Sequence, residues 1–201
     1  MNPIIHTCEQ GSDEWFDAKR GKVGASRFKD VLNKKTGRGL YMRRLAGEII
    51  TGENAPAFSN DFMDEGVEKE AAARRTYETV KNCTVEQIGF YQISDYVGVS
   101  PDGLIGDDGD LEIKSPVAST HIKYILNNKL PSEYRAQVQG RLWAENRQWC
   151  DFVSYMPEMK SKPFHCIRIF RDEEYIKNLE KEIKKFVGEL KGIIEKIAVP
   201  F

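Results

Sequence analysis

Three side chains that could carry out chemistry stand near one another in the middle of the chain: Asp102, Glu112 and Lys114. Glu112 and Lys114 are two residues apart in the apolar stretch LEIK, so in a β-strand their side chains share one face. Asp102 ends a preceding strand, and a glycine-rich segment with turn signals joins it to the second strand. Such a hairpin can bring Asp102 beside Glu112.

Two carboxylates at one point repel each other unless a cation lies between them, and oxygen ligands suit Mg²⁺ or Mn²⁺. The ammonium of Lys114 beside that ion could hold a water or neutralise charge that develops on a phosphate. The spacing alone also occurs by chance, but the apolar neighbours place these groups at a strand rather than on a solvated helix. We interpret Asp107, Asp108 and Asp110 as solvated turn residues.

The elements that must position these groups follow from the hydrophobic periodicity. Helices are expected at 41–50, 61–80, 119–127, 132–146 and 172–197, and strands within 83–94 and at 96–100, 110–114, 149–155 and 165–170. Ser12 and Ser26 are expected to cap helices that follow them. This order predicts a single α/β domain over 1–201, with a central mixed β-sheet flanked by helices and a long C-terminal helix.

Composition narrows the class of protein. The chain has 201 residues, 40% hydrophobic and 30% charged, with a formal charge of −1, so it is not a polycationic nucleic-acid coat. A local basic groove remains compatible with that charge. The cysteines are widely spaced, the first residues turn polar too early for a signal peptide, and no apolar run approaches ~20 residues. We therefore expect reduced thiols, a cytoplasmic location and no membrane contact.

The segment SPDGL followed by LEIKSP resembles the core motif of the PD-(D/E)xK nuclease superfamily. More closely, the chain resembles the bacteriophage lambda exonuclease-like family, the YqaJ-type viral recombinases. Three further segments in the same order support the resemblance: EQGSDEWFDAKRGKVGASRF, GVEKEAAARRTYE and YRAQVQGRLW. It implies a restriction-endonuclease-like core. It also implies a Mg²⁺-dependent exonuclease that degrades one strand of linear duplex DNA from a 5′-phosphorylated end, releasing mononucleotides and leaving 3′ tails for recombination by strand annealing.

The resemblance also implies roles for individual residues. Asp102, Glu112 and the carbonyl of Ile113 would hold Mg²⁺, for which Mn²⁺ could substitute, and Lys114 and Glu70 would complete the catalytic set. The 5′-phosphate would be held by Arg20, Ser26, Ser100 and Gln137, and further DNA contacts would come from Phe62, Met63, Lys34, Lys35, Arg38 and Arg135. Without the resemblance, we would interpret Glu70 as a solvated helix residue that pairs with Arg74. Ser26 would be an ordinary helix cap, and Arg20 a surface charge.

The same family implies partners: the ends of double-stranded DNA, two further copies in a ring-shaped homotrimer, and a single-strand annealing protein. Three other interpretations remain open from the sequence. The chain could be a related endonuclease, a non-catalytic DNA-binding module, or a protein with a metal-stabilised hairpin and no nucleic-acid role.

Overall fold

The computed structural model of the chain describes residues 3–33, 37–55 and 61–197, with side chains for all of these except 61–67. The elements in chain order are β1 (Ile4–His6), α1 (Asp13–Lys19), the 3₁₀ turn η1 (Ala25–Arg27), α2 (Phe28–Leu32), α3 (Arg38–Thr51), α4 (Asp61–Lys81), β2 (Phe90–Ser94), β3 (Val97–Val99), β4 (Gly103–Ile105), β5 (Gly109–Lys114), α5 (Ala118–Asn127), the 3₁₀ turn η2 (Ser132–Tyr134), α6 (Arg135–Ala144), β6 (Trp149–Tyr155), β7 (Phe164–Phe170) and α7 (Glu173–Ile197).

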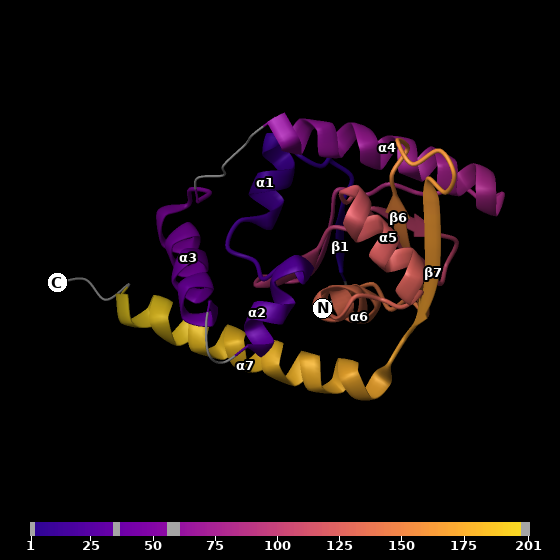
Figure 1. Cartoon of the computed structure of the whole chain (residues 1–201). Helices are drawn as coiled ribbons and strands as arrows, with labels where there is room; N and C mark the ends of the chain where they lie inside the picture. Colours follow the sequence, from indigo (N-terminus) through magenta and orange to yellow (C-terminus); the bar gives the residue numbers. More distant parts are fainter. Residues whose placement is uncertain (1–2, 34–36, 56–60, 198–201) are drawn as a thin grey trace.

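A mixed four-stranded sheet carries the candidate catalytic groups. Its strand order is β4-β5-β6-β7, with β5 and β6 parallel and the other two pairs antiparallel. A parallel pair needs a long crossover, which here contains α5 and α6. Helices α4, α5 and α6 contact this sheet (Figure 1). A separate antiparallel sheet has the order β1-β2-β3. The predicted mixed sheet with flanking helices is confirmed.

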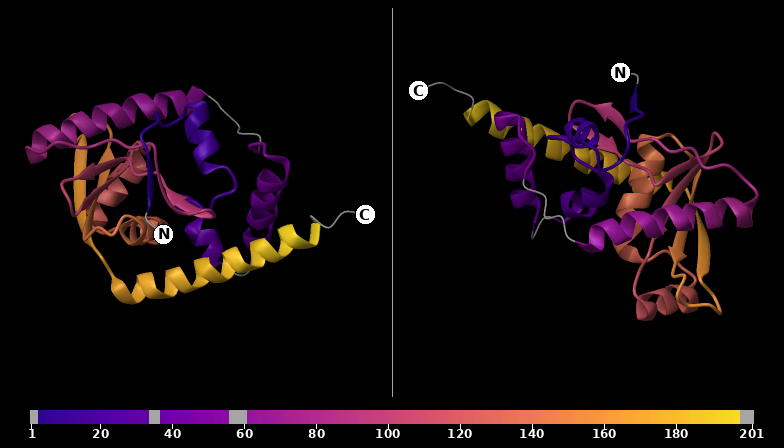
Figure 2. Two further views of the ribbon diagram at one scale, coloured as in Figure 1. Left: turned by 180° about the vertical axis from the view of Figure 1, so that it is seen from behind. Right: turned by 90° about the horizontal axis from the view of Figure 1, so that it is seen from above.

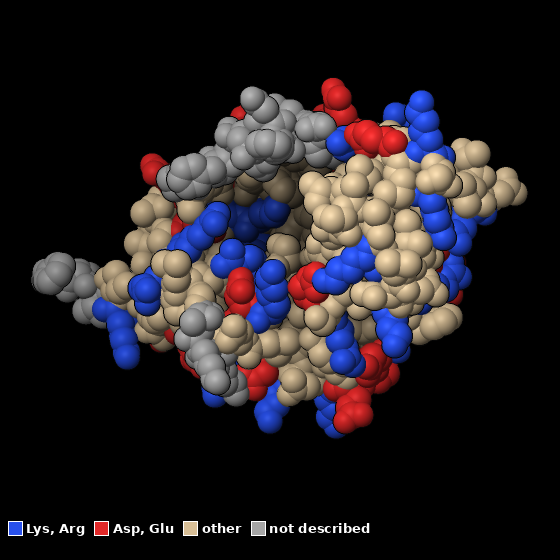
Figure 3. Space-filling model, in the orientation of Figure 1, with Lys and Arg blue, Asp and Glu red and all other residues tan. Residues whose placement is uncertain are grey.

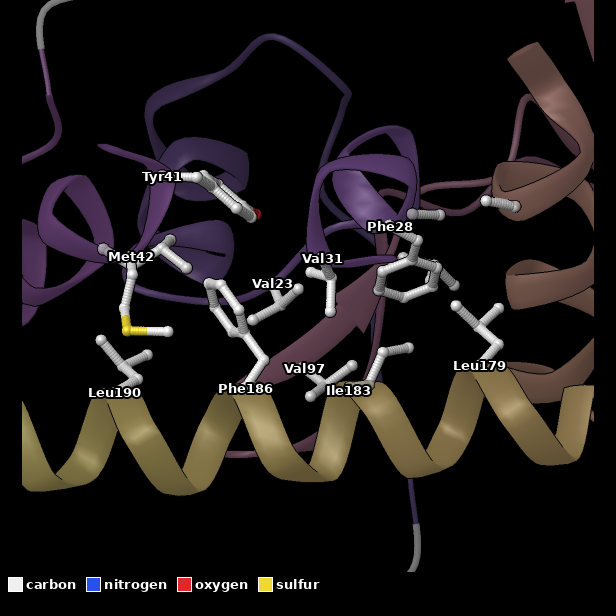
Figure 4. Packing of buried hydrophobic residues seen from close by; sticks show 14 of the residues in the cluster. Val23, Phe28, Val31, Tyr41, Met42, Val97, Leu179, Ile183, Phe186 and Leu190 are labelled. Carbon is white, nitrogen blue, oxygen red and sulfur yellow. The ribbon is translucent and has the colours of Figure 1, made fainter. Parts of the chain in front are cut away.

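Helix α7 organises the largest apolar cluster. Its residues Ile176, Leu179, Ile183, Phe186 and Leu190 recur at helical spacing and are all buried. They pack against α2, α3 and α6, and Figure 4 shows Phe186 pointing up between Met42 and Val23. Helices α7 and α4 run along opposite edges of the molecule in the left view of Figure 2. The long amphipathic C-terminal helix is thus confirmed, and its apolar face packs within the chain.

Four expectations about elements need correction. Strands β1 and β4 were not predicted, whereas the strand expected within 83–94 is present as β2. Asp102 precedes β4 rather than ending the strand before it. Ser12 is the N-cap of α1, as expected, since its side chain accepts from the Trp15 N–H at 3.3 Å. Ser26 is not the predicted N-cap, because it lies inside η1, whose N-cap is Gly24, and the N-cap of α2 is Arg27.

Among the helices of the described residues, none is both long and apolar enough to cross a membrane.

Candidate active site

The β4–β5 hairpin brings Asp102 and Glu112 together. Gly103 pairs with Leu111, and the same register places Asp102 opposite Glu112. The Asp102 carboxylate accepts a hydrogen bond from the Ile113 N–H at 2.6 Å. Leu111 and Ile113 point into an apolar cluster, so Glu112 and Lys114 share the opposite face, as the alternation predicts.

Glu112 is fully buried and surrounded by donors. Lys114 forms an ion pair with it, and the Gln137 amide donates to both of its oxygens at 2.9 and 3.0 Å. Arg141 Nη1 lies 2.7 Å from Glu112 Oε2. Burial alone would raise the pKa of Glu112, but Lys114 and Arg141 outweigh it and lower that pKa, so the group is a carboxylate at neutral pH.

The pKa values of Asp102 and Lys114 are both raised, whereas that of Glu112 is lowered. Burial, together with the negative charge of Glu112, raises the pKa of Asp102 to about 7. Burial disfavours the Lys114 ammonium, but the carboxylates of Glu112 and Asp102 raise its pKa above the ordinary range. Lys114 is therefore a cation that faces two carboxylates.

The donor chemistry fits a hard divalent cation. Asp102 and Glu112 repel each other, and the Ile113 carbonyl directly follows Glu112 in the chain. Within the residues that the structure describes, no group of three or more Asp, Glu, His or Cys side chains is placed to hold a metal. The chain would thus supply two carboxylates and one carbonyl, and Mg²⁺ commonly keeps several waters beside such a small set.

Helix α4 borders this site through Glu70 and Arg74. Arg74 Nη2 lies 2.6 Å from Glu70 Oε1, and Arg74 Nε donates to the Asp102 carbonyl at 3.0 Å. The helical pair expected without the family is therefore present, and it also fastens α4 to Asp102. Burial raises the pKa of Glu70, while Arg74 and Lys114 act against that rise. Glu70 is close enough to Lys114 and Glu112 to interact with both electrostatically.

A cavity of about 760 Å³ lies next to α1 and α3. Arg20 and Ser26 both line it, and so do the cations Lys19, Lys22, Arg27 and Arg44, among others. Arg20 pairs with Asp17, and the Lys19 ammonium lies 3.2 Å from the centre of the Trp15 ring. Figure 3 shows basic side chains gathered in a hollow on one face of the molecule. Lys19 was not among the residues that sequence reasoning selected.

The other two residues expected at the 5′-phosphate lie outside the lining of this cavity. Ser100 accepts a hydrogen bond from the Trp15 indole N–H at 3.0 Å, and Trp15 belongs to α1 like Lys19. Gln137 instead contacts Glu112. The predicted phosphate residues are therefore divided between the cavity, the Trp15 contact and the carboxylate pair.

The predicted DNA contacts are not gathered at the carboxylates. Arg38 pairs with Glu189 at 2.5 Å and lies over the Phe186 ring, and so joins α3 to α7. Arg135 pairs with Asp172 at 2.8 Å and lies over Tyr175. Lys34 and Lys35 lie outside the described residues, and the side chains of Phe62 and Met63 lie outside the described side chains.

The prediction for Asp110 was wrong, and Arg141, which lies beside the candidate site, was not predicted. Asp110 is not a solvated turn residue, because it is fully buried and forms a two-pronged ion pair with Arg141, which is itself fully buried. The available signal was Arg141 standing four residues after Gln137, which puts both on one face of α6.

Comparison with known proteins agrees with this architecture. The model of the YqaJ-like viral recombinase domain matches residues 14–148. An alkaline exonuclease of Laribacter hongkongensis is 38% identical, with 92% of this chain and 96% of that one covered and a TM-score of 0.86; it has also been crystallised with dAMP. A phage-related exonuclease of Haemophilus somnus, 14% identical over 88% of this chain and 96% of that one, shares the fold at a TM-score of 0.69. The protein ExoD of Escherichia coli K12 is 28% identical over 72 residues, which are 36% of this chain and 83% of ExoD.

Proposed function

The chain belongs to the YqaJ-like viral recombinase family of lambda exonuclease-like nucleases, and we propose that it is a Mg²⁺-dependent 5′-to-3′ exonuclease of linear double-stranded DNA. The observation that carries this proposal is the hairpin in which Asp102, Glu112 and Lys114 meet. An exonuclease of 38% identity over nearly the whole chain supports the same reaction class.

The proposed chemistry assigns each group a task. Asp102, Glu112 and the Ile113 carbonyl would hold Mg²⁺, or Mn²⁺ in its place, and the bound ion would polarise the scissile phosphate and increase the acidity of a water. Lys114, a cation here, would neutralise charge that develops on the phosphate oxygens. Glu70 would orient the attacking water from the side of α4.

End recognition would come from the basic cavity. Arg20 can offer a two-pronged contact to a phosphate, and Lys19 and Arg44 add positive charge to the same lining. Ser26, Ser100 and Gln137 are proposed as further phosphate ligands on the basis of the family. Holding the 5′ end would set the polarity and release mononucleotides, the class of molecule with which the Laribacter enzyme was crystallised. The 3′ tails would then serve recombination with a single-strand annealing protein.

The test is digestion of linear duplex DNA with Mg²⁺, labelled at either end and carrying a 5′-phosphate or a 5′-hydroxyl, beside a closed circle. We expect early release of the 5′ label as mononucleotide, preference for the 5′-phosphate and an intact circle. Lys114→Ala should bind DNA as the parent does and lose hydrolysis at least a hundredfold. Lys185→Ala, on the exposed face of α7, should match the parent in both DNA binding and hydrolysis.

Each alternative outcome has a distinct meaning. Cutting of the circle would keep the metal site and replace the exonuclease by an endonuclease. DNA retention without any cutting would move the protein to the binding-module class. A Lys114→Ala variant that digests DNA at the parental rate would falsify the catalytic assignment.

A further inference from the structure

Arg141 is a cation buried beneath the candidate active site that contacts carboxylates on both strands of the hairpin. Its side chain is fully buried, like those of Asp110 and Glu112. An unpaired buried charge is costly, so the guanidinium needs carboxylates beside it. Its partners divide into two groups, one on each side of the guanidinium.

One side of the guanidinium is fixed by Asp110. Nε donates to Asp110 Oδ2 at 3.0 Å, and Nη2 donates to Oδ1 at 2.9 Å and to Oδ2 at 2.7 Å. Nη2 also donates to the Leu111 carbonyl at 2.7 Å. A two-pronged contact of this kind sets the plane of the guanidinium as well as its position.

The other side points at the proposed metal ligands. Nη1 lies 2.7 Å from Glu112 Oε2 and 3.8 Å from Asp102 Oδ1. Nη1 makes no hydrogen bond of good geometry within the described residues, so it acts on Glu112 through its charge, unlike a pair in which the guanidinium contacts a single carboxylate. The chain offers such a pair for comparison, since Arg168 grips the buried Asp151 at 2.8 and 2.9 Å, where Tyr77 also donates to Asp151.

We propose that Arg141, aligned by Asp110, is a positioning residue that fixes the Glu112 carboxylate for the cation of the active site. This inference rests on the proposed function, because it concerns the same metal ligands. Lys114 and Gln137 restrain Glu112 from the solvent side, and Arg141 restrains it from the interior. Glu112 thereby keeps one orientation whether or not DNA is present.

The test is a charge-neutral replacement of the pair, Asp110→Asn with Arg141→Gln. The double replacement removes one acidic and one basic side chain that pair with each other, so the formal charge around Glu112 stays unchanged. Mn²⁺ binding is measured by electron paramagnetic resonance without DNA, and digestion is followed at saturating DNA. We expect Mn²⁺ affinity and turnover each to fall about 10- to 100-fold, the usual cost of losing a group that orients a metal ligand.

The matched control is Asp151→Asn with Arg168→Gln, which removes a similar pair from β6 and β7. It should lower the unfolding temperature and leave Mn²⁺ affinity within twofold of the parent. If the first double variant does not fold, Arg141→Lys serves instead. It keeps the charge, but an ammonium lacks the planar fork that spans Asp110 and Glu112. It should likewise weaken Mn²⁺ binding at least fivefold.

The outcomes separate this inference from the function on which it rests. If the parent binds Mn²⁺ and digests DNA, and either Arg141 variant matches its Mn²⁺ affinity, the positioning role is wrong and the exonuclease stands. If the parent neither binds Mn²⁺ nor cuts DNA, both proposals fall together.

Discussion

Lys19 holds its charge in surroundings that disfavour it. Burial, then the nearby Arg44, lower the pKa of Lys19 from 10.5 to about 8, while Glu48 acts in the opposite direction. Between pH 8 and 10.5 the unfolded chain therefore binds more protons than the folded one, and the free energy of unfolding rises with pH. Lys19→Met removes this group, so we expect the parent to gain stability relative to the variant as the pH increases through that window.

Urea denaturation of both proteins at pH 7.5 and 9.5 measures the effect. Lys185→Met, at an exposed position, is the control and should show no such difference in pH dependence. A constant offset between the parent and Lys19→Met at the two pH values would mean that Lys19 titrates normally in the folded protein.

Single residues show where sequence reasoning succeeded and where it stopped. The two-residue period of a strand was enough to put Glu112 and Lys114 on one face, and a hairpin was enough to bring Asp102 beside them. The same stretch misled us about Asp110, because an aspartate after Asp107, Asp108 and Gly109 has the composition of a turn. Its partner Arg141 is on a helix beyond two further elements, and periodicity carries no information on that contact.

At the scale of elements, α6 is held close to α2 by the absence of a side chain at Gly140. A Cβ there would lie 2.2 Å from the Phe28 ring and 3.3 Å from Leu179. Gly140→Ala should therefore lower the free energy of unfolding by about 1–3 kcal/mol, the usual cost of overpacking a core. Because α6 also carries Gln137 and Arg141, digestion of DNA should slow in the same variant.

Gly188→Ala provides the matched control for this substitution. Gly188 lies in the interior of α7, and a Cβ there would meet nothing within 4 Å. Alanine should stabilise this helix by roughly 0.5–1 kcal/mol relative to glycine. Equal stability changes at the two positions, measured by chemical denaturation, would show that α6 and Phe28 can move apart freely.

Element prediction worked where the hydrophobic pattern was long. Helix α7 and strand β6 were placed within a residue of their bounds, since each has a sustained period. The short strand β4 was missed because Gly103 and Gly106 give it the composition of a turn. Segment 103–105 is a strand because it pairs with β5 and because Leu104 bridges to Glu86. Local composition carries no information about these two contacts.

At the scale of the whole molecule, a net charge of −1 makes DNA affinity depend on where the cations lie. In the described structure, one cavity is lined by five cations, Lys19, Arg20, Lys22, Arg27 and Arg44, and by three acidic residues, Asp13, Asp17 and Glu48. A phosphate entering it therefore meets a local excess of positive charge. A single cavity on a free chain would release its DNA after each encounter. Several copies enclosing the duplex would retain it, which is why we propose the homotrimeric ring expected from the family.

Light scattering during gel filtration tests this proposal, and we expect a mass about three times the 23.0 kDa of the chain.

The ring also predicts behaviour that a monomer cannot show. When excess unlabelled duplex is added after digestion begins, enzyme already on the labelled DNA should finish that molecule, since an enclosed substrate cannot exchange without reaching an end. A closed circle as competitor should not slow digestion of linear DNA, because it has no end to thread. A monomeric mass together with immediate arrest by the linear competitor would show that one chain acts alone, with the cavity and the carboxylates of the same copy providing all the grip on the DNA.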